Sequence, residues 1–416
     1  MIPLYLIIHN EGNYSPRSIE VTIQNTEKTK KSFKIDITLT ILLLTMAVFS
    51  IVAIQGAIPL TSSTVNGQDI LIKQGIWFVL GFSLLAGLLF FGIDRLFTGV
   101  RVFYWILMFL LFLLFLDRFI DLPFIRPLNG TRAWIILPGI GTLQPSEFMK
   151  IVLIIITANV VDEHNRNRTI ISFKTDMLLF ANVAKYVLPP LALIILQPDT
   201  GIPIVIIFTI LAILAVSGIK HHWIWAGLFV VVVALGGSVY LYNTSPETLA
   251  SILGNSYRLN RFHGWLATEK YIYSWGNQLY TSLLAVGSAG WTGHGNETVL
   301  ITLLEPQNDF IFAVIGKNYG FLGTATVLIV NLLLDLKLLA IALAYEHPRE
   351  RYMVAGLLGM LLFQQVQNMG MIVGLLPITG ITLPMISAGG SSLLSYMIPF
   401  AIVYHMSNEN KNKTIH

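Results

Sequence analysis

Long runs of apolar residues, separated by short polar segments, cover most of the chain from residue 35 onward. A run of about 17 to 25 apolar residues is long enough to cross the hydrocarbon core of a bilayer as a helix. The pattern predicts eight such helices, at 35–57, 74–93, 99–116, 145–161, 222–242, 319–345, 352–376 and 391–407.

The stretch from Lys185 to Ser217 is too long for one span. Gln197-Pro198-Asp199-Thr200-Gly201 interrupts its middle with a proline, a glycine and a charge, and each of these disfavours a continuous membrane helix. We therefore expect two spans that meet at a tight outer turn, which brings the total to about ten helices. The predicted fold class is an all-α polytopic integral membrane protein.

Composition supports this membrane location and excludes several kinds of chemistry. Hydrophobic residues make up 55% of the chain, charged residues only 12%, and the mean hydropathy is +0.71. A water-soluble domain of this size is less apolar. The chain has no cysteine, so it has no disulfide, thiolate nucleophile or cysteine-based metal site. We expect membrane lipids as partners, and no nucleic acid.

The distribution of Lys and Arg orients the helices. With the N-terminus inside, 17 of the 26 basic residues fall on inner segments and eight on outer ones, and cytoplasmic loops carry such an excess. Both termini are therefore expected in the cytoplasm, as a basic tail at 1–34 that lies on anionic lipid and a short tail at 408–416. The membrane domain covers 35–407. Its outer face carries a loop at 117–144 and one large extracellular loop at 243–318, between helices 7 and 8.

A carboxylate, Asp309, stands where the large outer loop runs back into apolar sequence. An ionisable group held at a membrane boundary is costly to keep, so it is a functional candidate by default. Its chemical role depends on what else the fold brings to the outer face.

Two opposite charges, Glu147 and Lys150, lie near the start of the span at 145–161. Their spacing of three residues places them on one helix face, where they neutralise each other in a poorly solvated setting. Two interpretations remain equally open: a buried pair that fixes helix packing, and a pair that lines a polar cavity, with Lys150 facing an anionic group such as a diphosphate.

Other polar residues near the outer ends of spans allow two interpretations each. Arg132, two residues before Trp134, suits either phosphate recognition through its planar guanidinium or anchoring of the loop at the interface. Asp199 is expected to cap the next helix, with a cavity role as the alternative. Ser391 belongs to a run of small residues at the start of the last span, which suits an anion site at a helix N-terminus or close helix packing.

Together these segments resemble one known family, the shape, elongation, division and sporulation (SEDS) proteins, which are peptidoglycan glycosyltransferases of the RodA, FtsW and SpoVE group. Among the branches, the turn before Trp134 is most similar to RodA. The motifs that carry the resemblance occur in the family's order: Asn129-Gly130 with Arg132-Ala133-Trp134, Gln144-Pro145-Ser146-Glu147 with Lys150, Gln197-Pro198-Asp199-Thr200-Gly201, Asp309-Phe310-Ile311-Phe312-Ala313-Val314 with Gly320-Phe321, and Ser387 with Gly389-Gly390-Ser391-Ser392.

The resemblance implies an enzyme of the bacterial cytoplasmic membrane, with its active face outside, that polymerises lipid II into glycan strands. It implies that Asp309 is the catalytic base and that a class B penicillin-binding protein is the partner. The leaving diphosphate needs positive charge from a side chain or from a divalent cation, Mg²⁺ or Mn²⁺, for which Asp309 is a candidate ligand. The residues expected to bind substrate or line its cavity are Arg132, Trp134, Gln144, Ser146, Glu147, Lys150, Asp199, Glu305 and Ser391.

The chain departs from the family's pattern beside Asp309. Leu304 stands where a proline is usual, Glu305 keeps the acid, and Gln307-Asn308 replace a polar pair; further on, Lys317-Asn318 replace two acids. The carboxylate itself is kept, so the resemblance still implies an active enzyme, with weakened activity or a changed partner left open.

Two other classes of function remain open. One is a transporter that flips lipid-linked precursor, because about ten helices with Gly and Pro breaks and intramembrane charges also describe transporters, although the two halves show no internal repeat. The other is a non-catalytic scaffold for a penicillin-binding protein. The choice among elongation, division and sporulation is open as well.

Overall fold

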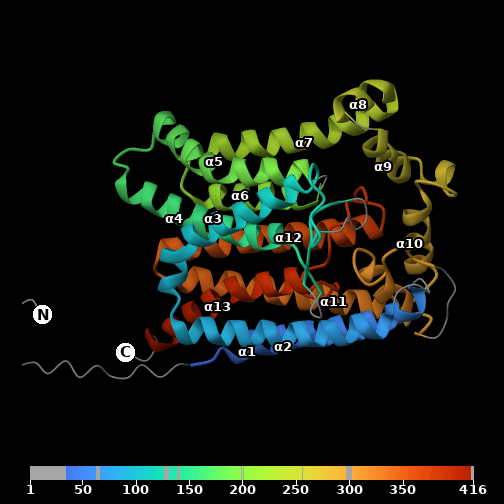
Figure 1. The fold of residues 1–416 in the computed structure, drawn as a ribbon, viewed down its shortest axis with the longest axis horizontal. Helices are drawn as coiled ribbons and strands as arrows, with labels where there is room; N and C mark the ends of the chain where they lie inside the picture. Colours follow the sequence, from blue (N-terminus) through green and yellow to red (C-terminus); the bar gives the residue numbers. More distant parts are fainter. Residues whose placement is uncertain are drawn as a thin grey trace, which may run out of the picture. The chain divides into compact units, whose positions relative to one another are not determined.

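Long helices account for most of the regular structure (Figure 1). The computed structural model describes residues 34–61, 66–125, 131–137, 141–197, 199, 201–254, 256–296 and 302–413. The predicted N-terminal tail, except Lys34, lies outside these residues. The long helices are α1 (Ile37–Ala57, continued by the short η1, Ile58–Leu60), α2 (Gly67–Phe91), α3 (Asp94–Leu116), α4 (Pro145–Asn167), α5 (Phe173–Leu196), α6 (Gly201–Val216), α7 (His221–Thr244), α11 (Ile311–Ala344), α12 (Pro348–Ile372) and α13 (Gly390–Lys413).

Every predicted span overlaps one of these helices. Among the described residues, six helices are long and apolar enough to cross a membrane, namely α1 with η1, α2, α3, α5, α7 and α11. This supports the polytopic membrane fold. α6 is apolar but has only 16 residues, and α4, α12 and α13 carry more polar side chains, so the total of ten spans stays a prediction.

α4, α12 and α13 carry polar side chains because other helices enclose them. α4 packs against α3, α5, α6, α12 and α13, and it buries both Glu147 and Lys150. α12 likewise buries Gln364 and Asn368. Polar groups inside a membrane bundle face its interior, where they bond to one another and to the backbone.

The predicted break within 185–217 is confirmed. α5 ends at Leu196 and α6 begins at Gly201. Asp199 Oδ1 accepts hydrogen bonds from the backbone N–H groups of Gly201 (3.1 Å) and Ile202 (3.2 Å), so it caps α6 as predicted. Pro198 and Thr200 lie outside the described residues.

Both predicted outer loops contain regular structure. The first contains an antiparallel hairpin, β1 (Ile135–Leu137) and β2 (Gly141–Leu143). In Figure 1 the helices of the second gather beyond one end of the long helices. They are α8 (Pro246–Leu253), α9 (Ser256–Leu266), η2 (Thr268–Tyr271) and α10 (Asn277–Gly287).

α11 begins at Ile311 and not at the predicted residue 319, because the helix continues through a kink. Gly320 has φ 62° and ψ −155° inside the helix, a conformation that glycine adopts without a side-chain clash. A Cβ there would lie only 2.5 Å from the backbone nitrogen of Gly293. The end of the large loop therefore crosses the helix at the kink, and the first turns of α11 belong to the region expected as loop.

The start of α1 and the end of α13 meet at one end of the bundle, which we call the termini end. Asp36 caps α1 and forms ion pairs with Lys337 of α11 (2.9 Å) and Lys411 of α13 (3.7 Å). Ser407 also donates a hydrogen bond to this carboxylate. The described ends of the chain thus lie on the same side of the bundle, as predicted, and their location in the cytoplasm stays a prediction.

Replacing Asp36 with Ala is expected to lower the free energy of unfolding by about 2 to 4 kcal/mol. Burial alone would raise the pKa of Asp36, but hydrogen bonds from Ser407, Lys337 and the Leu39 N–H lower it to about 2. The stabilisation is therefore complete above about pH 4 and is lost as the pH falls through 2. Denaturant unfolding in detergent micelles measures the loss.

Asp69→Ala provides the matched control. It breaks an exposed ion pair with Lys73 at 2.6 Å, and exposed pairs contribute about 0 to 1 kcal/mol. If both substitutions cost the same, the Asp36 cluster does not stabilise the helix ends.

Candidate active site

Asp309 lies in the turn that leads into α11 at the end of the bundle opposite the termini, which we call the site end. Its backbone oxygen accepts a hydrogen bond from Asn368 Nδ2 of α12 (2.8 Å), and the same amide group donates to the Ile381 oxygen (2.7 Å). The carboxylate is half-buried and approaches Gly380, where a Cβ would lie 3.2 Å from Oδ2. Gly380 has φ 74°, so a side chain there would be both strained and pressed against the carboxylate.

Glu305 is fixed beside Asp309 by the two residues that depart from the family's pattern. Its Oε2 accepts hydrogen bonds from Gln307 Nε2 (2.9 Å) and Asn308 Nδ2 (2.8 Å). Glu305 itself has φ 48°, which is uncommon for a residue other than glycine. The side chains of Gln307 and Asn308 therefore position a second carboxylate, that of Glu305, near Asp309.

The turn changes the acidity of Asp309. Burial, with a smaller contribution from the negative charge of Glu305, raises the pKa of Asp309 to about 6, while Arg261 opposes the shift. This burial could not be predicted from the sequence, from which we expected an ordinary carboxyl pKa. The group is still mostly ionised at neutral pH, but it binds a proton more readily than an exposed aspartate.

Arg261, on α9, supplies positive charge to this region and was missed in the sequence. Its Nη1 donates to the Ile378 oxygen (3.2 Å), two residues before Gly380. Trp265 on the same helix donates to the Gly374 oxygen (3.0 Å), so α9 docks on the segment between α12 and α13. The outer loop contains several basic residues, and only the folded structure distinguishes the one that faces Asp309.

The small-residue segment before α13 holds the Asp309 turn from the other side. Ser387 Oγ donates to the Asn308 oxygen (2.7 Å), and the Ala388 N–H donates to the Gln307 oxygen (2.9 Å). Gln74 of α2 accepts from the Gly389 N–H (3.2 Å). The segment thus fixes the turn against α2 and α13.

A chain of hydrogen bonds continues from α13 to α6. Ser391 Oγ accepts from the Gln144 N–H and donates to the Thr142 oxygen, both at 3.0 Å. Gln144 Nε2 then donates to Asp199 Oδ2 (3.1 Å), and burial raises the pKa of Asp199. The structure therefore brings Gln144, Asp199 and Ser391 into one polar network, and Asp199 both caps α6 and faces the interior.

Glu147 and Lys150 lie in the first turns of α4, which begins directly after Gln144 of this network. Glu147 Oε2 and Lys150 Nζ are 2.9 Å apart, and the Lys150 side chain is completely enclosed. The ammonium lies 5.5 Å from the centre of the Tyr396 ring, whose hydroxyl donates to Gln364 Oε1 (3.1 Å). Ser146 is also buried here. The geometry is that of a packed ion pair, and an anionic ligand does not reach Lys150 in this arrangement.

Arg132 and Trp134 are placed on the first outer loop. Arg132 Nη1 contacts Asp117 Oδ2 (2.8 Å) and Asp121 Oδ1 (3.1 Å), and Trp134 is half-buried just before β1. The structure joins Arg132 to these two acids and not to the Asp309 turn, which matches the loop-anchoring interpretation. Asn129 and Gly130 lie outside the described residues.

Few groups near Asp309 suit a divalent cation. In the described part of the chain, no group of three or more His, Cys, Asp or Glu side chains is arranged to hold a metal ion. Asp309 and Glu305 supply two carboxylates, so a Mg²⁺ or Mn²⁺ ion there would take its remaining oxygen ligands from a substrate and water.

Comparison with known proteins adds independent evidence. Residues 35–412 match the model of the FtsW, RodA and SpoVE family, described as cell cycle proteins. Stage V sporulation protein E of Bacillus subtilis is 30% identical over 93% of this chain and 99% of its own length. The peptidoglycan glycosyltransferase MrdB of Helicobacter pylori is 28% identical over 80% of this chain and 82% of its own.

Solved structures share the fold. A chain from a peptidoglycan synthase complex that coordinates polymerization and crosslinking superimposes with a TM-score of 0.70 and 26% identity, over 91% of this chain and 98% of that one. The rod shape determining protein RodA of Thermus thermophilus gives a TM-score of 0.61 and 26% identity, over 90% and 97%. The relatives include sporulation and shape proteins, so the expected closeness to RodA stays a prediction.

Proposed function

The chain belongs to the FtsW, RodA and SpoVE family of cell cycle proteins, and on that basis we propose that it is a peptidoglycan glycosyltransferase that polymerises lipid II, with Asp309 as general base. Two of its relatives are named peptidoglycan glycosyltransferase MrdB and probable peptidoglycan glycosyltransferase FtsW. The observation that supports the site assignment is the half-buried Asp309 carboxylate, which lies in a turn whose backbone oxygen accepts a hydrogen bond from Asn368 and which is within the electrostatic reach of Arg261.

The proposed chemistry gives Asp309 and Arg261 separate roles. Asp309 accepts the proton of the acceptor sugar hydroxyl as that oxygen attacks the anomeric carbon of the donor and the diphosphate leaves. Arg261 supplies positive charge for the departing diphosphate, a role for which the sequence had suggested Lys150, Arg132 or a divalent cation. A bound Mg²⁺ or Mn²⁺, held by Asp309 and Glu305, would add to that charge.

The cellular setting follows from the same proposal. We propose that the chain lies in the bacterial cytoplasmic membrane with Asp309 at the outer face, where lipid II is presented. The excess of basic residues on the opposite side supports this orientation. Because a similar solved chain comes from a complex that coordinates polymerization with crosslinking, we propose a class B penicillin-binding protein as the partner.

A reconstituted assay with fluorescent lipid II tests the function. The native protein is expected to produce glycan polymer, and the Asp309→Asn variant is expected to produce none. Translocation of lipid II without polymer would indicate a transporter instead. If neither product forms, and neither changes with Asp309→Asn in the presence of a penicillin-binding protein, the chain acts as a scaffold.

The rate of polymerisation is expected to fall on the acid side with an apparent pKa near 6, because protonated Asp309 cannot accept a proton. Glu305→Gln keeps an acceptor for Gln307 and Asn308 but removes the neighbouring negative charge, so the acid limb should move to lower pH. The pH dependence of the initial rate measures this, with the exposed Glu269→Gln as control. A limb that stays in place or moves to higher pH would contradict the role given to Glu305.

A further inference from the structure

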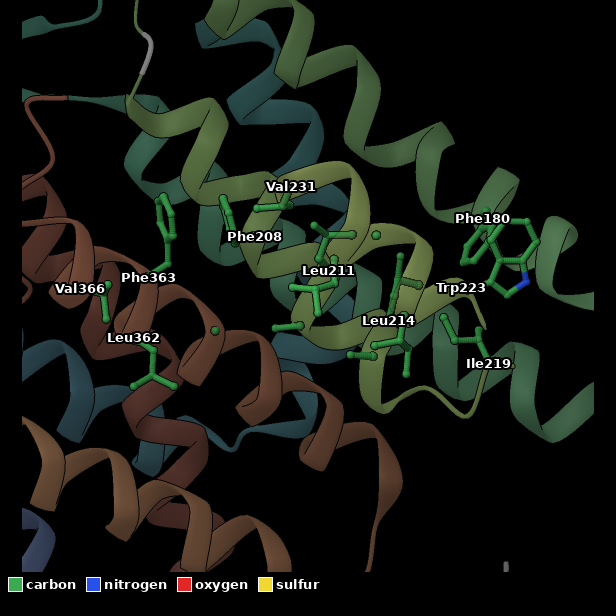
Figure 2. A pocket seen from close by; sticks show the side chains of 16 residues that line it. Phe180, Phe208, Leu211, Leu214, Ile219, Trp223, Val231, Leu362, Phe363 and Val366 are labelled. Atoms are coloured by element: carbon green, nitrogen blue, oxygen red, sulfur yellow. The ribbon is translucent and has the colours of Figure 1, made fainter. Parts of the chain in front are cut away.

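The helix α7 packs loosely against the rest of the described bundle. None of its residues is buried, although it is long and apolar enough to span a membrane. A groove of about 510 Å³ lies between α7 and helices α5, α6 and α12 (Figure 2). Its lining includes small residues, Ala212 and Ala215 on α6, Gly227 on α7 and Gly359 on α12. A Cβ at Gly227 would meet nothing within 4 Å, whereas Gly359 packs closely against Ala212.

The groove suits a hydrocarbon chain. Apart from the indole N–H of Trp223, its lining side chains are hydrocarbon, and Figure 2 shows Leu211, Leu214 and Ile219 along it. Its volume lies within the range of roughly 300 to 1,000 Å³ that is typical of small-molecule sites. A hydrocarbon-lined groove on a membrane helix is filled by hydrocarbon, because water there would lose hydrogen bonds.

The groove runs from the termini end of the bundle toward the site end. One end of the lining is formed by Ile219, which follows α6, and by Trp223 in the first turn of α7, and the other end by Phe363 and Val366 of α12. α6 begins at the site end, where Asp199 caps it, so Ile219 and Trp223, which follow its last turn, are near the termini end. A lipid whose headgroup sits at this end belongs to the leaflet opposite Asp309.

Two basic residues lie beside the mouth of the groove at this end. One is Arg168, whose Nη1 donates to the Gly218 oxygen (3.2 Å). The other is Lys220, two residues after Gly218, and Ile219 of the lining stands between Gly218 and Lys220. Asp176 is the acid of this cluster; it is buried, and one of its oxygens accepts the Lys220 backbone N–H (3.3 Å). The mouth therefore presents cationic side chains, while its acid faces inward.

A polar atom in the lining also needs a partner. The indole N–H of Trp223 is buried and has no hydrogen-bond acceptor among the described residues. Phe173 and Phe180 fix the ring, with centroids 5.3 Å and 5.2 Å away. Tryptophan in this position commonly donates to the ester or phosphate oxygens at the edge of the hydrocarbon region.

We propose that this groove binds an acyl chain of an anionic phospholipid from the leaflet opposite Asp309, with the phosphate between Arg168 and Lys220 and an ester oxygen accepting from Trp223. The lipid is distinct from the substrate. It fills the groove and so packs against α7. The site does not depend on the chemistry at Asp309.

Brominated lipids test this site, because bromine quenches the fluorescence of a tryptophan that it touches. The full chain is reconstituted in phosphatidylcholine vesicles that contain a small fraction of brominated phosphatidylglycerol or of brominated phosphatidylcholine. The difference between the native protein and Trp223→Phe isolates the signal of Trp223. We expect several-fold stronger quenching by the anionic lipid.

Matched variants separate the groove from the general membrane surface. Gly227→Leu fills the groove and should remove most of the quenching of Trp223, whereas Gly236→Leu, on the same helix and outside the lining, should not; a Cβ at either glycine meets nothing within 4 Å. Lys220→Gln should abolish the preference for the anionic lipid, and Arg95→Gln, an exposed cation at the same end, should leave it unchanged. Equal quenching by both lipids, equal effects of the two glycine variants, or displacement of the brominated lipid by lipid II would overturn the proposal.

Discussion

Asp309→Asn is expected to lower the rate of glycan polymerisation at least about 100-fold, because an amide of the same shape cannot take the hydroxyl proton. The fold should be unaffected. Asn368 bonds to the backbone oxygen of residue 309, a contact that the substitution leaves in place. The amide also avoids the cost of burying a charge beside Glu305, so the unfolding temperature should stay equal or rise slightly.

The measurement is gel separation of fluorescent glycan polymer, with thermal unfolding in the same detergent. Asp69→Asn is the control, since Asp69 is an exposed acid at the start of α2 and its loss should change neither value. Polymerisation by Asp309→Asn within about threefold of the native rate would exclude Asp309 as a general base.

Lys150→Ala is expected to lower the free energy of unfolding by about 3 to 5 kcal/mol, because it leaves Glu147 charged in a buried setting without its partner. Polymerisation should fall with the amount of folded protein. Denaturant unfolding and the yield of monodisperse protein measure the effect. A cost below about 1 kcal/mol would mean that Glu147 takes up a proton or finds another donor.

The double variant Glu147→Gln with Lys150→Met separates packing from ligand binding. Removing both charges restores a neutral interior, so stability should return to near the native value. If the pair only fixes helix packing, polymerisation returns with it. If the ammonium meets the substrate diphosphate in a state that the enclosed geometry does not display, the double variant folds but stays inactive.

Features encoded locally could be predicted from the sequence. The break at Gln197 to Gly201 was visible because proline, glycine and an acid interrupt an apolar run, and the structure ends α5 and begins α6 there. The cap formed by Asp199 followed from the same local pattern. The pairing of Glu147 with Lys150 followed from helical spacing alone.

Features that depend on distant backbone segments could not be predicted. Arg261 acts near Asp309 only because α9 docks on the segment before α13, and no spacing along the chain links the two residues. The early start of α11 depends on the approach of Gly293 to Gly320, which hydropathy does not report. The enclosure of Lys150 depends on α12 and α13 as well as on its own helix.

The turn at Asp309 is held mainly through its own backbone oxygens, and this has a consequence for which mutations it tolerates. The oxygens of residues 307, 308 and 309 accept from Ala388, Ser387 and Asn368. The position of the turn is therefore encoded in its neighbours and not in the side chains of Gln307 and Asn308. In a saturation library, positions 307 and 308 should accept many residues with modest shifts in acidity, whereas Ser387 and Asn368 should be nearly intolerant, and divergence beside the carboxylate can accumulate without moving it.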